Sequence, residues 1–351
     1  MVLHSVFELP LDSTHRLPDD RPLTEHKQSI LNNYKNIIMM NFLTGSNVLS
    51  TLLGLGETKI DPEILTTAMT AAGIIQGSLL MFTPNLSRKM WGIKDDSIYT
   101  LAHLEYVGAS ILSMGVTCFC LFVLKLEETH KTVGWTLIVW VVENSLALLK
   151  RHPAKAGGDP TLQVFWLFLM FETIRACFMS ESYTHAAVAS CSLIALNGIL
   201  AAVQPRISAN MYGYSKVQLN DDQLNTLRGC GYECLAMSVF LFSLLNDIQA
   251  RTALGLTSMV ITAHCAHALV GKVWKSTYGN FGSLLFYLWM IFHASSAANL
   301  LASKEVGYFM GGVIGMVTAL KLPFLFEYPQ IAEEELLTKN SWWWKEAHMG
   351  I

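Results

Sequence analysis

Two histidines in one apolar segment are the most evident candidates for chemistry in this chain. His264 and His267 are three residues apart, so on a helix both imidazoles lie on one face. Together they could bind one metal ion or one haem propionate. A di-metal helical bundle needs Glu-x-x-His motifs from facing helices, and the other apolar segments offer only single acids and histidines. We therefore favour two buried, hydrogen-bonded histidines over a metal site, and these two remain the only candidate metal ligands.

The ionisable residues within apolar segments are predicted to form one intramembrane polar cluster. A charged side chain at the centre of a lipid-facing helix costs about 2.5–3.5 kcal/mol on insertion scales, so such residues usually face the protein interior. The members expected in the same half of the bilayer are Glu105, Glu143, Arg228, Glu233, His264 and His267. Because no nucleophile paired with a base accompanies them, we assign no catalytic residue.

The segments that must position this cluster are long and apolar. Of the 351 residues, 52% are hydrophobic and 15% are charged, against roughly 25% charged in soluble domains. An apolar helix of about 20 residues crosses a hydrocarbon core of roughly 30 Å. The sequence therefore predicts an all-α, polytopic membrane protein. The expected spans are residues 62–82, 100–124, 132–149, 161–180, 184–203, 225–246, 252–271 and 279–302, with a ninth at 305–326 and a weaker, interfacial helix at 36–56.

An internal repeat organises these helices. The segment GSLLMFTPNLSRKMWG (77–92) aligns without a gap to GILAAVQPRISANMYG (198–213), which gives a period of about 121 residues. Four helices per copy is an even number, so both copies must be inserted in the same direction, around a pseudo-two-fold axis along the membrane normal. We expect a tandem duplication of a four-helix bundle. The predicted organisation is a polar N-terminal segment (1–60), repeat 1 (61–183), repeat 2 (184–303) and a ninth helix with a Trp-rich tail (304–351).

The loops predict the orientation of the chain in its membrane. Lys and Arg are retained on the cytosolic-type side, and most basic loop residues follow the first and third helix of each repeat. These loops and the C-terminus are therefore expected on the cytosolic, matrix or stromal side. Trp342, Trp343 and Trp344 in the tail favour anchoring at the lipid headgroups over docking of a partner subunit. The sequence does not distinguish between organelles.

Glu105 and Arg228 occupy equivalent places in the two copies, each three residues before a glycine, Gly108 or Gly231. Opposite charges at equivalent positions could form an ion pair between the copies, with the glycines permitting close helix approach. Alternatively, both side chains extend to the headgroups, because each is about one turn from the expected surface. The sequence leaves these two arrangements equally open.

The unit formed by an apolar helix, a proline, an aromatic-Gly pair and a second helix with a charged residue before a glycine resembles the DoxX-like family of four-helix membrane proteins. The residues that carry this resemblance are Pro84, Trp91, Gly92, Glu105 and Gly108, and then Pro205, Tyr212, Gly213, Arg228 and Gly231. It covers the first two helices of each copy. The resemblance implies a four-helix bundle and supplies no reaction. Glu105 departs from the family pattern, which often has Arg at this place.

The remaining features order the function classes. No GxSxG, P-loop or GxGxxG motif is present, and no basic patch interleaved with aromatics indicates nucleic acid. These absences favour a non-catalytic scaffold or accessory subunit, surrounded by membrane lipids and bound to other membrane subunits or to a second copy. The first alternative is a transporter or channel for a small solute or lipid, with its path between the repeats. The second is a redox or quinone-handling enzyme, and the aromatic stretches at 165–171 and 286–292 could contact a bound lipid or quinone.

Overall fold

The computed structural model describes residues 50–56, 60–179, 184–216, 218–271 and 279–325, and these residues form helices without a strand. The first group of long helices comprises α3 (Pro62–Phe82), α5 (Ile98–Cys118), α6 (Thr129–Leu149) and α8 (Thr161–Phe178). The second group comprises α9 (Thr184–Val203), α11 (Asp221–Leu245), α12 (Ala250–Val270) and α14 (Gly279–Leu301), followed by α15 (Lys304–Leu325). The short helices are α4 (Pro84–Met90), α7 (His152–Lys155), α10 (Pro205–Met211) and the 3-10 turn η3 (Tyr214–Lys216).

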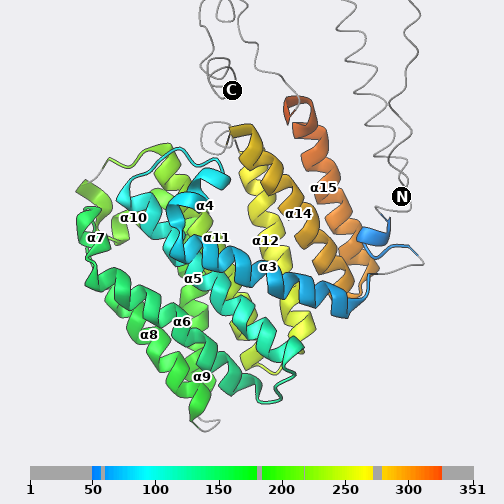
Figure 1. Cartoon of the computed structure of the whole chain (residues 1–351), viewed down its shortest axis with the longest axis horizontal. Helices are drawn as coiled ribbons and strands as arrows, with labels where there is room; N and C mark the ends of the chain where they lie inside the picture. The colour runs from blue at the N-terminus through cyan, green and yellow to red at the C-terminus, as the bar shows by residue number, and fades with distance from the viewer. Residues whose placement is uncertain (1–49, 57–59, 180–183, 217, 272–278, 326–351) are drawn as a thin grey trace, which may run out of the picture. The chain divides into compact units, whose positions relative to one another are not determined.

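The predicted helices are confirmed, and seven of those described are long and apolar enough to cross a membrane. This establishes an all-α, multi-pass integral membrane protein. The apolar stretch described for α9, Ala187–Val203, is shorter than those seven, and α15 forms the predicted ninth helix without being one of them. The predicted interfacial helix at 36–56 lies mostly outside the described residues, as does the Trp-rich tail. In Figure 1, α12, α14 and α15 lie side by side.

Prolines and caps set the helix ends. Pro84 and Pro205 are the first residues of α4 and α10, directly after α3 and α9 end, because proline fits the first turn of a helix but not its interior. α4 and α10 each have seven residues and are followed by glycines with positive φ, 72° at Gly92 and 80° at Gly213. Such a φ is strained for other residues, so the glycines permit the chain to turn toward the next helix.

The second helices of the two groups, α5 and α11, begin at the same end of the bundle. Ser97 caps α5, and Asn220 and Gln223 form a capping box at the start of α11. Gln223 Nε2 donates to Ser97 Oγ at 3.0 Å, which places the two helix starts in direct contact. α5 and α11 therefore begin together and run in the same direction. The location of the Pro84 and Pro205 corners on one face of the membrane remains a prediction.

Glycines permit the closest helix approaches at matching places in both groups. A Cβ at Gly108 of α5 would lie 2.4 Å from Met81 N of α3, and a Cβ at Gly231 of α11 would lie 2.5 Å from Ala202 N of α9. Gly77 of α3 faces the backbone of α5 in the same way. Backbones this close leave no room for a side chain. The first helix of each group is thus held tightly against the second.

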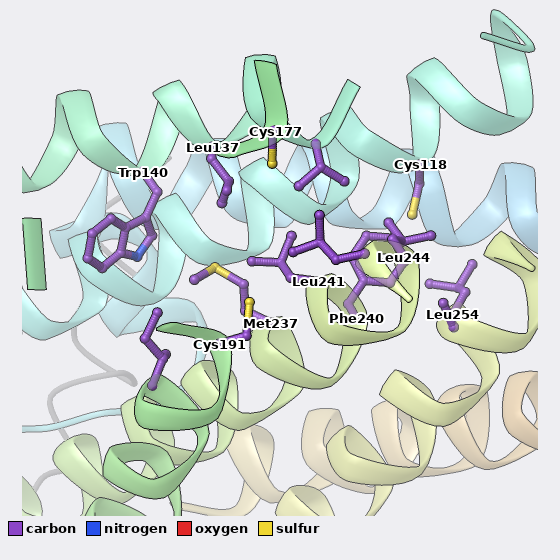
Figure 2. Packing of buried hydrophobic residues seen from close by; sticks show 14 of the residues in the cluster. Cys118, Leu137, Trp140, Cys177, Cys191, Met237, Phe240, Leu241, Leu244 and Leu254 are labelled. Atoms are coloured by element: carbon purple, nitrogen blue, oxygen red, sulfur yellow. The ribbon is translucent and has the colours of Figure 1, made fainter. Parts of the chain in front are cut away.

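The apolar core lies along the second half of α11. Phe240, Leu241 and Leu244 are completely or almost completely buried there. Figure 2 shows them packed among side chains from α5, α6, α8, α9 and α12, including Leu137 and Leu254. Interiors of this density contain few voids larger than a water molecule. The apolar side chains are therefore closely packed in this half of the bundle, and the lining residues of the cavity described below lie toward the start of α5 and α11.

Candidate functional site

A cavity of about 110 Å³ lies between α5, α6 and α8 of the first group and α9, α10 and α11 of the second. We call it cavity 1. Two neighbouring helix faces contribute to its wall: His103, Tyr106 and Ser110 from α5, and Leu227, Cys230 and Cys234 from α11 (a spacing of three and four residues in each case). At this spacing, all three side chains of a helix lie on one face. Most of the wall is aromatic or aliphatic, with a few polar groups directed inward.

Side-chain amides form a hydrogen-bond network on one side of cavity 1. Gln163 Nε2 of α8 donates to Tyr106 Oη of α5 and lies 3.5 Å from Asn144 Oδ1 of α6. Asn144 Nδ2 in turn donates to Trp140 O at 2.9 Å. Buried amides are costly unless they are paired, and here each fixes the next across three helices. The network therefore holds polar groups in a fixed position at the cavity wall.

Tyr212 and Asn197 form a second polar group in the wall of cavity 1. Asn197 Nδ2 of α9 donates to Tyr212 Oη at 3.0 Å, and Asp159 N donates to Tyr212 O at 2.9 Å. Asn197 Oδ1 is buried without a hydrogen-bond partner among the described residues. Burial raises the pKa of Tyr212, and burial raises the pKa of Tyr214 to about 12. Both phenols are therefore neutral at physiological pH and act as hydrogen-bond partners, not as charges.

Glu233 is the acidic residue in the membrane-spanning part of the wall. It is 7% exposed, and its Oε1 lies 3.7 Å from His264 Nδ1. The Tyr232 ring stacks on His264 with centroids 4.9 Å apart, and Tyr232 Oη is 2.8 Å from His267 Nδ1. Glu233, His264 and His267 of the predicted cluster are thus brought together, with Tyr232 between the two histidines. Tyr232 was not predicted, because an aromatic ring within an apolar helix does not by itself indicate a functional role.

Glu105 and Glu143 lie apart from that group. Glu105 Oε2 is 3.5 Å from His152 Nδ1 of α7, and Glu143 interacts electrostatically with Glu105. Burial, followed by the charges of Lys150 and Lys155, lowers the pKa of His152. His152 is therefore mostly neutral at pH 7, and its contact with Glu105 is weaker than a full ion pair. Neither acid lines cavity 1.

The ion pair that one interpretation of the sequence placed between Glu105 and Arg228 is wrong. Arg228 Nε donates to Ala202 O at 3.1 Å, and its Nη1 donates to Asn225 Oδ1 at 2.9 Å. Ala202 lies in the last turn of α9, where unpaired carbonyls and the negative end of the helix dipole attract a cation. The negative end of a helix repels an acidic side chain at the equivalent place, and Glu105 lies beside His152 instead.

The described residues contain no group of three or more His, Cys, Asp and Glu side chains arranged to hold a metal ion. His264 and His267 share a face as predicted, but His264 contacts Glu233 and His267 contacts Tyr232. The predicted cluster is therefore two groups, one around Glu105 and Glu143 and one around Glu233. The amides of cavity 1 were missed because each one is a single polar residue in its own helix.

Comparison with protein-family models, with curated proteins and with solved structures finds no match to this chain.

Proposed function

We propose that this membrane protein binds a small amphipathic molecule in cavity 1. The observation that carries the proposal is an aromatic cavity between two helix groups with hydrogen-bonded amides from both groups in its wall. Ligand sites in helical proteins are usually concave, largely apolar and supplied with a few oriented polar groups. Cavity 1 has each of these properties.

The size of cavity 1 limits the ligand. At about 10–15 Å³ for each water-sized group, a volume of 110 Å³ holds roughly seven to eleven non-hydrogen atoms. That corresponds to one substituted ring or to the head of a larger lipid. The polar wall groups suit a head that both donates and accepts hydrogen bonds, and the aromatic wall suits its apolar part.

Two buried oxygens favour a bound molecule over an empty void. Asn197 Oδ1 and Ser208 Oγ line cavity 1 and have no hydrogen-bond partner among the described residues. An unsatisfied buried polar atom costs about 1–3 kcal/mol. A bound ligand, or water in its absence, removes this cost by supplying the missing hydrogen bond. An empty cavity is expected only where the wall is apolar.

A carrier fits this arrangement better than an open channel. The second half of α11 is closed by packed apolar side chains such as Phe240 and Leu244 (Figure 2). Cavity 1 therefore ends within the bundle, and a ligand that reaches it must leave through the end near α4 and α10 or between helices. The scaffold or accessory-subunit function, its partner subunits and a redox function remain predictions.

We also propose that the two helix groups arose by duplication of a DoxX-like four-helix unit. The matching glycine contacts at Gly108 and Gly231, the matching short helices α4 and α10 and the shared end of α5 and α11 support this origin. The basic loops support a cytosolic, matrix or stromal location for the α4 and α10 end.

The experiment is native mass spectrometry of the full chain released from nanodiscs of its own membrane lipids. The wild-type protein should retain one small molecule, identified after extraction as a lipid, a sterol or a quinone. Ala201→Trp places a large ring in cavity 1, because Ala201 is 3% exposed and lines it. The fraction of protein that carries the bound molecule should then fall at least tenfold. Leu196→Trp, on the lipid-exposed side of α9 at 62% exposure, is the matched control and should retain the ligand.

A second variant avoids filling the cavity. Asn197→Leu removes the amide that faces the ligand, and the loss of one hydrogen bond worth about 0.5–1.5 kcal/mol weakens binding about 2- to 13-fold. Both variants must elute as monodisperse protein. Wild-type protein without a bound molecule, or equal occupancy in the wild type and in Ala201→Trp, contradicts the proposal.

A further inference from the structure

A second cavity, of about 70 Å³, lies on the other side of the contact between α5 and α11. We call it cavity 2. Its walls come from α3 and α5 of the first group and from α11, α12 and α14 of the second, and they include Trp91, Glu233, His264, Phe286 and Trp289. At about 10–15 Å³ per water-sized group, it holds roughly five to seven non-hydrogen atoms.

Several residues that line cavity 2 correspond to residues that line cavity 1 when the two helix groups are aligned. Gln76 and Trp91 line cavity 2, and Asn197 and Tyr212, each 121 positions later, line cavity 1. Leu104 in cavity 2 likewise matches Leu227 in cavity 1, 123 positions later. The proposed duplication therefore yields two cavities built from the same places in the fold. Their existence as separate cavities does not depend on that origin.

The chemistry of cavity 2 differs from that of cavity 1. Where cavity 1 has Tyr106 and Asn144, cavity 2 has Gly229 and Cys265, so the amide network has no counterpart there. Trp91 and Phe286 pack against each other with ring centroids 5.0 Å apart, and Trp289 extends this aromatic wall. The acidic group is Glu233, which also lines cavity 1.

Glu233 has one oxygen available for a ligand. It is 7% exposed, its Oε1 lies 3.7 Å from His264 Nδ1, and its Oε2 is buried without a hydrogen-bond partner among the described residues. His264 lines cavity 2 and is held in place by its stack on Tyr232. An ionised carboxylate only accepts hydrogen bonds, so the group that satisfies Oε2 must be a donor. An aromatic wall favours an apolar body and also accommodates an ammonium group.

From this geometry we propose that cavity 2 is a second binding site, which takes a small apolar molecule with one hydrogen-bond donor, a hydroxyl or an ammonium. The donor binds Glu233 Oε2, and the apolar body packs against Trp91 and Phe286. This site goes beyond the proposed function of cavity 1, because its wall shares only Val107 and Glu233 with cavity 1 and its ligand chemistry is different. Either cavity can be empty while the other is filled.

The test is photolabelling of the full chain in nanodiscs with a hexanol probe that carries a diazirine. Labelled peptides should map to the wall of cavity 2, around Trp91 or Phe286. Hexan-1-ol and hexylamine compete as hydroxyl and ammonium donors, and 1-methoxypentane is the control of equal size without a donor. Competition by the ether should be at least fivefold weaker. Because the probe carries a hydroxyl, competition by hexan-1-ol shows that a hydroxyl is sufficient, and stronger competition by hexylamine shows that the site prefers an ammonium.

Variants assign the labelling to cavity 2. Ile111→Trp fills cavity 2 and should reduce labelling at least tenfold, and Ile75→Trp, on the exposed side of α3, should leave it unchanged. Glu233→Gln retains the size of the side chain and should reduce competition by hexylamine at least fivefold. This variant keeps the test decisive if Ile111→Trp does not fold.

Two results overturn the proposal. The first is equal competition by the ether and the alcohol, because a donor is then not required. The second is loss of labelling in Ala201→Trp but not in Ile111→Trp, because Glu233 is then approached from cavity 1. Failure of the native mass spectrometry test on cavity 1 leaves this test unaffected, so the two proposals fail separately.

Discussion

Gly231→Ala should destabilise the protein although it adds only one methyl group. The new Cβ would lie 2.5 Å from Ala202 N, 2.6 Å from Gly198 O and 2.8 Å from Ala201 Cβ. Two of these atoms belong to the α9 backbone, which cannot rotate away as a side chain can, so α9 and α11 must separate by nearly 1 Å. Overpacking of this kind costs about 1–3 kcal/mol. Gly108→Ala should cost a similar amount, because its Cβ would lie 2.4 Å from Met81 N.

Gly312→Ala is the matched control for this prediction. It lies within α15, is exposed, and a Cβ there meets nothing within 4 Å. The same substitution should therefore leave stability unchanged or raise it by up to about 1 kcal/mol through helix propensity. The assay is the free energy of unfolding in bicelles, obtained by steric trapping. If Gly231→Ala is as stable as Gly312→Ala, the close contact between α9 and α11 is not real.

Three further perturbations follow from single contacts. Tyr212→Phe removes the acceptor of the hydrogen bond from Asn197 Nδ2 and should lower the free energy of unfolding by about 0.5–1.5 kcal/mol, measured by the same assay; no loss contradicts the contact. Gln223→Ala breaks the capping box of α11 and the hydrogen bond to Ser97, so the free energy of unfolding should fall by about 1 kcal/mol. An unchanged free energy of unfolding contradicts the contact between the two helix starts. The pKa of His152 is below its ordinary value of 6.5 in the folded protein, so the unfolded chain binds the proton first and stability falls as the pH drops through 6.5. His152→Gln should flatten this pH dependence between pH 7.5 and pH 5.5, and an equal slope in both proteins refutes the assignment.

The helices were predictable because the physics that forms them is local. Runs of about 20 apolar residues must hydrogen-bond their own backbone in lipid, and only a helix or a closed barrel does so. Pro84 and Pro205 end the preceding helices wherever the rest of the chain lies. The even number of helices between these corners predicts that both lie on one face, and the bond from Gln223 to Ser97 shows that the helices after them begin together.

The cavities were not predictable because they depend on how helices rotate against each other. Asn144, Gln163 and Asn197 come from three different helices, and each one by itself is a polar residue in an apolar run. Only packing brings the first two together and leaves Asn197 Oδ1 unpaired in the described residues.

The failed ion pair has a comparable cause. The repeat alignment predicts that Glu105 and Arg228 are equivalent, but equivalence around an axis does not bring two side chains into contact. Arg228 binds the carbonyl of Ala202 near the end of α9, and Glu105 lies beside His152. Each side chain is satisfied within its own helix group, as the field at a helix end favours a cation and disfavours an acid.

The ligand proposed for cavity 1 should be visible between the two helix groups. The most direct measurement is a cryo-electron microscopy map of the full chain in its native membrane lipids. Non-protein density of ring or headgroup size should lie between the Tyr106–Gln163 pair and the Asn197–Tyr212 pair. Side chains that close this space, or isolated water peaks in place of a connected molecule, would contradict the claim.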